Sequence, residues 1–153
     1  MQVEPGRVFR EAWIAGVTKH YPGEPKASYI TPWDDTPEWE QASAAAVYEQ
    51  VRAFTEISDG NTARLTREQK GRFVATCWIA QIYKHIPDPK PAYVADWADM
   101  PEWQRETDSD IFEHIEKQAS QTIATRQAQP VRHPHLLEPD VDMAATRSTQ
   151  GYD

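Results

Sequence analysis

Apolar side chains recur at helical spacing in four stretches of the chain. Two of these stretches, residues 5–20 and 66–86, end one or two residues before a proline, Pro22 and Pro87, and a helix interior does not tolerate proline. The other two stretches carry apolar faces around Val47 and around Ile111. The pattern predicts a mainly α protein. Because the stretch of residues 66–86 is apolar on more than one face, we expect its helix to be central and buried over most of its surface.

Polar residues mark where three of these helices begin. Thr66 is followed three residues later by glutamine, which is the spacing of a capping box. Asp35 and Asp99 each precede a glutamate by three residues. We therefore expect Asp35 and Asp99 at the N-cap of the two later helices, with Glu38 and Glu102 completing a reciprocal cap.

The four stretches belong to an internal duplication. Residues 29–39 read YITPWDDTPEW and residues 93–103 read YVADWADMPEW, and Gly-Arg, Trp-Ile-Ala and Lys-His also repeat in register upstream. We call residues 5–57 repeat one and residues 65–126 repeat two, with the polar, turn-rich residues 58–64 as the linker. Each repeat reads as helix, irregular loop, helix.

The loops contain several prolines and cannot be helical throughout. Residues 29–31 and 93–95 are candidates for short extended strands that pair across the repeats. Trp33 and Trp97 follow these segments, and we expect them to anchor the loops through an indole N–H bonded to a backbone carbonyl.

A single repeat of this length is too small to fold comfortably without a disulfide or a metal. We therefore expect one domain, residues 1–126, in which the two repeats pack about an internal pseudo-twofold axis. Trp13 and Trp78 lie in the middle of the first helices, where we expect core positions near the contact. Residues 127–153 lose the periodicity and form a C-terminal tail, either docked or disordered.

Charge and cysteine content limit the possible partners and the compartment. The net charge of −8 and the pI near 5.1 argue against duplex nucleic acid and anionic membranes, but not against a small anion held by a local basic cluster. No apolar run reaches the length of a membrane span or a signal sequence, so we expect a cytoplasmic protein. Cys77, the single cysteine, is better explained as a buried thiol than as a nucleophile.

The sequence contains no recognisable catalytic constellation, and we predict no enzymatic activity and no cofactor. It has neither a glycine-rich phosphate loop nor a serine in a nucleophile-elbow context. His133 and His135 offer two imidazoles, but no further histidine or cysteine has a supporting spacing. We therefore predict no metal site.

The candidate ligand-binding residues are aromatic or basic and occur in equivalent pairs. Trp39 and Trp103, in the first turn of the later helices, are suited either to stacking on a base or cation or to internal packing, and the sequence leaves both open. The basic pairs Lys19-His20 and Lys84-His85 end the first helices. They either interact with the free carbonyls of the helix C-terminus or bind an anion. The full set of candidates is Trp39, Trp103, Lys19, Lys84, His20, His85, Lys26, Lys90, Tyr29 and Tyr93.

The repeated unit resembles the RyR domain, the repeat named for ryanodine receptors and also found in bacterial and phage proteins. The matching residues in repeat one run from Trp33 to Glu38 with Val47, Tyr48 and Val51, and those in repeat two run from Trp97 to Glu102 with Ile111, Phe112 and Ile115. The resemblance implies tandem repeats in a mostly helical unit, without catalysis, and a nucleotide-type ligand in some members. Repeat two, with Glu106-Thr107-Asp108, is closer to the polar pattern of the family than repeat one.

Two functions follow as hypotheses. The first is a non-catalytic binding module for a small anionic ligand, held between the aromatic and basic residues of the two repeats. The alternative is a protein–protein interaction or structural module without a small-molecule ligand. Either function is compatible with a monomer or a homodimer.

Overall fold

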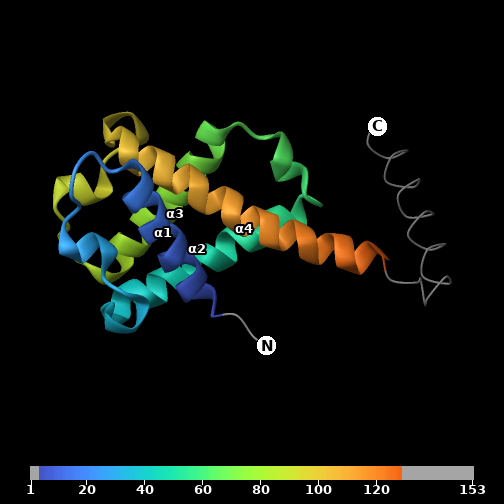
Figure 1. The fold of residues 1–153 in the computed structure, drawn as a ribbon, viewed down its shortest axis with the longest axis horizontal. Helices are drawn as coiled ribbons and strands as arrows, with labels where there is room; N and C mark the ends of the chain where they lie inside the picture. The colour runs from blue at the N-terminus through green and yellow to red at the C-terminus, as the bar shows by residue number, and fades with distance from the viewer. Residues whose placement is uncertain (1–3, 129–153) are drawn as a thin grey trace, which may run out of the picture. The chain divides into compact units, whose positions relative to one another are not determined.

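A computed structural model describes residues 4–128 of the chain. Its long helices are α1 (Pro5–His20), α2 (Glu38–Ile57), α3 (Arg67–His85) and α4 (Glu102–Ala128), shown in Figure 1. Repeat one supplies the first two of these helices and repeat two supplies the others. The predicted mainly α class is confirmed.

The structure confirms one predicted capping box and rejects two. The Thr66 hydroxyl accepts from the Gln69 backbone N–H at 3.1 Å, while the Gln69 side chain accepts from the Thr66 backbone N–H at 2.9 Å. In contrast, Pro37 is the N-cap of α2 and makes no side-chain cap bond. Asp35 and Asp99 belong to the preceding 3₁₀ turns, so neither is an N-cap residue. The Asp35 and Asp99 backbone N–H groups donate to the carbonyls of Pro32 and Asp96, so both residues belong to 3₁₀ turns that end before the long helices begin.

The loops are built from short 3₁₀ helices, and the strands expected at residues 29–31 and 93–95 are absent from the described part of the chain. The 3₁₀ helices are η1 (Ala27–Ile30) and η2 (Trp33–Asp35) in repeat one, η3 (Asn61–Arg64) in the linker, and η4 (Pro91–Val94) and η5 (Trp97–Asp99) in repeat two. The Tyr29 and Tyr93 backbone N–H groups donate to carbonyls three residues earlier, at 3.0 and 2.9 Å. These local bonds use the groups that a strand pair would need.

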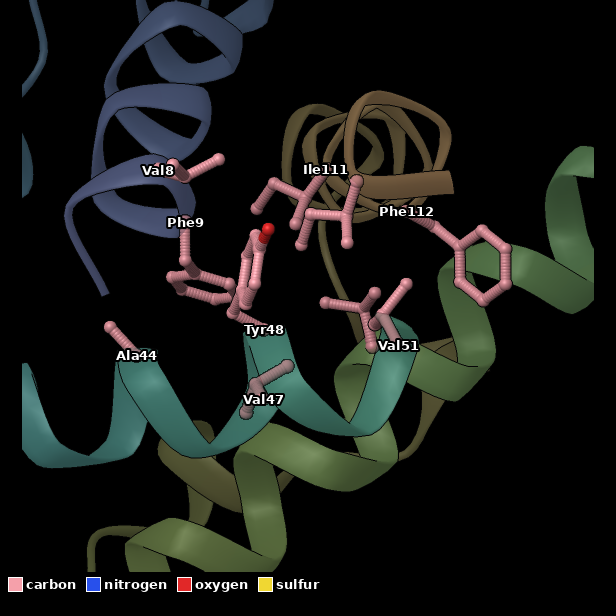
Figure 2. Close-up of a cluster of buried hydrophobic side chains, with 10 residues drawn as sticks. Val8, Phe9, Ala44, Val47, Tyr48, Val51, Ile111 and Phe112 are labelled. Carbon is pink, nitrogen blue, oxygen red and sulfur yellow. The ribbon is translucent and has the colours of Figure 1, made fainter. Parts of the chain in front are cut away.

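The core is centred on α2 and α4. Figure 2 shows Tyr48 and Val51 of α2 directed toward Ile111 of α4, with Val8 and Phe9 of α1 alongside, and Val47 and Phe112 belong to the same buried cluster. The largest fully buried side chains include Phe112, Ile111 and Ile115 of α4 and Val47 and Val51 of α2. The prediction that the helix of residues 66–86 is central was wrong, because one face of α3 is exposed and carries Tyr83 and Lys84. Apolar residues of α3 contact α2 and η4 as well as the core cluster.

Tryptophan side chains cross between the repeats in a reciprocal way. Trp103 of repeat two contacts Trp13 of repeat one, with ring centroids 5.9 Å apart. Trp39 of repeat one contacts Trp78 of repeat two, with centroids 6.3 Å apart. Trp13 and Trp78 are half-buried and pack against the core cluster, rather than lying fully inside it. The internal pseudo-twofold axis stays a prediction. The crossed tryptophan contacts are the observation that bears on it.

The compact unit of the chain ends at Ile123, and α4 continues to Ala128. The predicted tail from residue 129 onward, including His133 and His135, lies outside the described residues. Within the described residues, no helix has the length and apolar character that crossing a membrane requires.

Candidate functional site

Trp103 lies in an aromatic cluster that also contains Trp13, Tyr21 and Tyr29, which we call the Trp103 cluster. The Trp103 ring centroid is 4.9 Å from that of Tyr21 and 5.5 Å from that of Tyr29. The Trp13 indole N–H donates to the Tyr29 carbonyl at 2.8 Å, which ties η1 to α1. Rings from α1 and from the first loop therefore enclose Trp103 on several sides.

Two of the predicted basic residues contact this neighbourhood. The Lys26 ammonium lies 5.7 Å from the centroid of the Tyr29 ring. The His20 Nε2 atom lies 2.7 Å from the Asp110 Oδ2 atom of α4, so this imidazole is engaged by a carboxylate. Lys19 is exposed. Of the predicted anion-binding residues in repeat one, His20 is the least available.

Trp39 lies in a second group with Trp78 and His85, which we call the Trp39 cluster. The Trp39 ring centroid is 6.1 Å from that of His85. The Phe9 ring stacks on Trp78, with centroids 5.4 Å apart. Tyr93, the equivalent of Tyr29, is 53% exposed and makes no ring contact with Trp39 within the described residues. The Trp39 cluster thus lacks the tyrosine that covers Trp103.

The polar groups of the Trp39 cluster are also less satisfied. The His85 Nε2 atom is buried and has no hydrogen-bond partner among the described residues. The residue that corresponds to Asp110 in repeat one is Ala46, so the carboxylate that engages His20 has no counterpart beside His85. Lys84 and Lys90 are exposed. The cluster therefore combines an aromatic ring with an imidazole nitrogen that has no hydrogen-bond partner among the described residues.

The loop of repeat one is tied to α1 by a buried arginine. The Arg10 guanidinium donates from Nε to the Thr31 carbonyl at 3.0 Å and from Nη2 to the Ser28 carbonyl at 3.2 Å. The Glu40 carboxylate lies 3.8 Å from Arg10 Nη1. Burial raises the pKa of Glu40, and the nearby guanidinium offsets part of that rise. We assign the anchoring of the loop mainly to the two carbonyl bonds, which are shorter than the ion pair.

Repeat two has Ala75 where repeat one has Arg10, and a groove of about 470 Å³ lies beside it. The guanidinium of Arg72 lies 5.9 Å from the centroid of the Trp97 ring at this groove. The other residues that line it are Ala75, Thr76, Ile79, Asp96 and Ala98. The sequence comparison of the repeats did not single out this groove.

The loop tryptophans anchor the loops, but not through the predicted hydrogen bonds. The Trp33 indole N–H donates to a Glu4 carboxylate oxygen at 3.3 Å, rather than to a backbone carbonyl. The Trp97 indole makes no hydrogen bond within residues 4–128. Instead, each indole packs against a glycine of the preceding helix, Gly6 or Gly71, where a Cβ atom would collide with the ring. This close approach gives a physical reason for a glycine at this position in both repeats.

Other chemical groups in the described residues offer little reactivity. Burial raises the pKa of the Cys77 thiol to about 11, so the thiol is protonated and unreactive near neutral pH. Burial also raises the pKa of Asp108 well above its ordinary value, and this residue and Thr107 are buried in α4. No group of three potential metal-ligating side chains occurs within residues 4–128.

Comparisons with known proteins returned no match: no protein-family model, curated protein or solved structure is similar to this chain. The candidate site therefore depends on the chain's own geometry.

Sequence reasoning missed several residues at these sites. Tyr21 covers Trp103, and Asp110 contacts His20. Arg10 is bonded to the loop of repeat one, and its equivalent in repeat two is Ala75. The available signal was the set of differences between the repeats, since Arg10 aligns with Ala75 and Asp110 with Ala46.

Proposed function

We propose that the protein is a non-catalytic module that binds a small anionic, nucleotide-type ligand at the Trp39 cluster. The observation that carries this proposal is the His85 Nε2 atom, which is buried beside the Trp39 ring without a hydrogen-bond partner among the described residues. An unsatisfied buried polar atom costs about 1–3 kcal/mol, and a ligand oxygen that reached it would recover part of that cost.

In this proposal, Trp39, Lys84 and Lys90 supply the other interactions that a nucleotide needs. Trp39 offers a ring for stacking on a base, and stacking of this kind contributes about 1–3 kcal/mol per base. Lys84 and Lys90 are exposed and can neutralise phosphate charge. The resemblance to RyR domains supports the same ligand class, and we propose a distant relationship to that family. We further propose that the module acts in the cytoplasm, as a monomer or a homodimer.

The equivalent positions of the two repeats provide matched controls. Titration with mono-, di- and cyclic nucleotides at millimolar concentration should raise the melting temperature and quench tryptophan fluorescence. Lys84→Ala should weaken the response about tenfold, while Lys19→Ala, at the equivalent exposed position, should leave it unchanged. Trp39→Phe should weaken binding more than Trp103→Phe does. Absence of any thermal shift with all of these nucleotides would refute the proposal.

A protein–protein interaction or structural module is the second candidate. The observation that favours it is the exposure of large side chains, since Tyr83, Tyr93 and Ile57 are 58%, 53% and 83% exposed. Native mass spectrometry of freshly purified protein separates the two functions: a retained small molecule adds a defined mass, whereas a retained protein partner gives a heterocomplex.

A further inference from the structure

We propose that the groove beside Ala75 binds the guanidinium group of an arginine side chain from a partner protein. This site is separate from the Trp39 cluster and does not depend on the nucleotide proposal. Four observations support it: the use of this space in repeat one, the open groove in repeat two, the charge of the groove and the exposed ring next to it.

Repeat one shows that an arginine fits between the first helix and the loop. Arg10 is only 8% exposed, and its planar guanidinium donates to two loop carbonyls, those of Thr31 and Ser28. Guanidinium groups suit such a position because several N–H donors lie in one plane and the charge is weakly hydrated. Repeat one therefore supplies from its own helix the group that this space accepts.

Repeat two keeps the surrounding framework but lacks the arginine. Ala75 replaces Arg10 in α3, and Trp97 packs on Gly71 as Trp33 packs on Gly6. Ala75 is one of the residues that line the groove of about 470 Å³. A side chain that entered from outside would meet the wall of α3 on one side and η5 on the other.

The charged residues of the groove favour a cation over an anion. Asp96 lines the groove, and its equivalent in repeat one is Pro32, so repeat two has gained a carboxylate at this place. Arg72 also lines the groove, but its guanidinium is 3.3 Å from the Glu68 carboxylate and lies over the Trp97 ring. The charge of Arg72 is therefore partly compensated, while Asp96 is exposed to an incoming cation. The net charge of −8 acts in the same direction at long range.

A protein partner fits better than a small amine because the surface beside the groove is aromatic. Ile79 lines the groove, and Tyr83 follows it by one helical turn on the same face of α3. Tyr83 is 58% exposed. Tyrosine and arginine are both enriched at protein interfaces, and Tyr83 is placed to receive an apolar residue next to the incoming arginine.

The first test uses N-acetyl-arginine amide as the probe and measures backbone and indole N–H chemical shifts of the full chain by NMR. The expected result is a saturable shift at Thr76, Asp96 and the Trp97 indole, at least several times weaker for N-acetyl-lysine amide and absent for the uncharged N-acetyl-citrulline amide. Equal shifts for the citrulline and arginine probes would overturn the proposal. The absence of any shift at these residues with about 10–50 mM arginine probe would also overturn it.

Two variants locate the site. Ala75→Arg places in repeat two the side chain that repeat one has, and it should abolish the response. Asp96→Asn, at an exposed position where folding is not at risk, should weaken it about tenfold. An unchanged titration in Asp96→Asn contradicts the proposal even if Ala75→Arg does not fold.

Repeat one provides the converse experiment. Arg10→Ala opens the equivalent space, so the arginine probe should newly shift Thr31 and Trp33 and restore part of the lost melting temperature.

A peptide separates a protein partner from a free small molecule. Acetyl-Leu-Arg-Leu amide should bind at least several times more tightly than N-acetyl-arginine amide, and Tyr83→Ala should remove that gain without changing the affinity for N-acetyl-arginine amide. Equal affinity of the two probes would exclude the protein partner, and this result would leave the nucleotide titration at the Trp39 cluster unaffected.

Discussion

His20, the last residue of α1, and Asp110, in the middle of α4, are joined by a contact of 2.7 Å between Nε2 and Oδ2. The same carboxylate accepts from Arg67, at the start of α3, at 3.0 Å. Asp110 therefore links a helix of repeat one to two helices of repeat two. Partial burial would by itself raise the pKa of Asp110, but the hydrogen bonds from His20 and Arg67 outweigh it and lower the pKa below 3.8.

The first prediction concerns acid stability. Because the pKa of Asp110 is lowered in the folded state, its stabilising contribution is fully present above pH 3.8, the ordinary value, and is lost as the pH falls below it. Asp110→Asn should lower the free energy of unfolding by about 1–3 kcal/mol at pH 7. The difference between variant and wild type should shrink toward pH 3 in urea titrations. A difference that is constant from pH 7 to pH 3 would contradict the assignment.

Asp108, two residues earlier, should behave in the opposite way. Burial raises its pKa, so the folded state holds a proton that the unfolded state releases above pH 3.8. The stability cost is absent in acid and grows as the pH rises from 3.8 toward the raised folded pKa. Asp108→Asn should therefore stabilise the protein at pH 7, by on the order of 1 kcal/mol or more. The gain should vanish near pH 3, and a gain that persists there would point to packing instead.

The buried ion pair between Lys70 and Glu116 gives a third prediction. The Lys70 ammonium lies 2.9 Å from a Glu116 carboxylate oxygen, and both side chains are nearly inaccessible to solvent. Removing one partner leaves the other charge buried, so Lys70→Met should cost about 3–5 kcal/mol. The double variant Lys70→Met with Glu116→Leu should recover most of this loss. Denaturant unfolding of the wild type, the two single variants and the double variant measures the coupling free energy between Lys70 and Glu116. Losses of stability that simply add would argue against a buried pair.

Gly6 and Trp33 provide a fourth prediction. A Cβ atom at Gly6 would collide with the Trp33 ring, so Gly6→Ala should lower stability by about 1–3 kcal/mol in spite of the better helix propensity of alanine. Trp33→Phe removes the atoms that collide and should reduce the penalty of Gly6→Ala. Melting temperatures of the single and double variants test this directly. If the penalty were the same in both backgrounds, the ring would not be its cause.

The long helices could be predicted because local signals agree with one another. Apolar spacing, an early proline and a terminal Lys-His pair defined α1 from Pro5 to His20, and the Thr66 capping box defined the start of α3. The same reasoning failed at Asp35 and Asp99, because an aspartate three residues before a glutamate is equally compatible with a 3₁₀ turn. A short stretch of sequence does not determine which of the two local hydrogen-bond patterns is formed.

The candidate sites were only partly predictable. The aromatic and basic residues were found from their repetition, but their surroundings depend on contacts between the repeats, such as that of Trp13 with Trp103. Whether His20 and His85 are equivalent depends on Asp110 and Ala46, which lie on other helices. Spacing within one repeat contains no information about such partners.

The crossed tryptophan contacts also bear on how the chain folds. Since Trp39 packs on Trp78 and Trp103 on Trp13, each repeat completes its aromatic packing with a side chain from the other. Such contacts join residues distant in sequence, which slows folding but couples the two halves into one cooperative transition. A chain cut within η3 should then give fragments that are unstructured apart and regain structure when mixed.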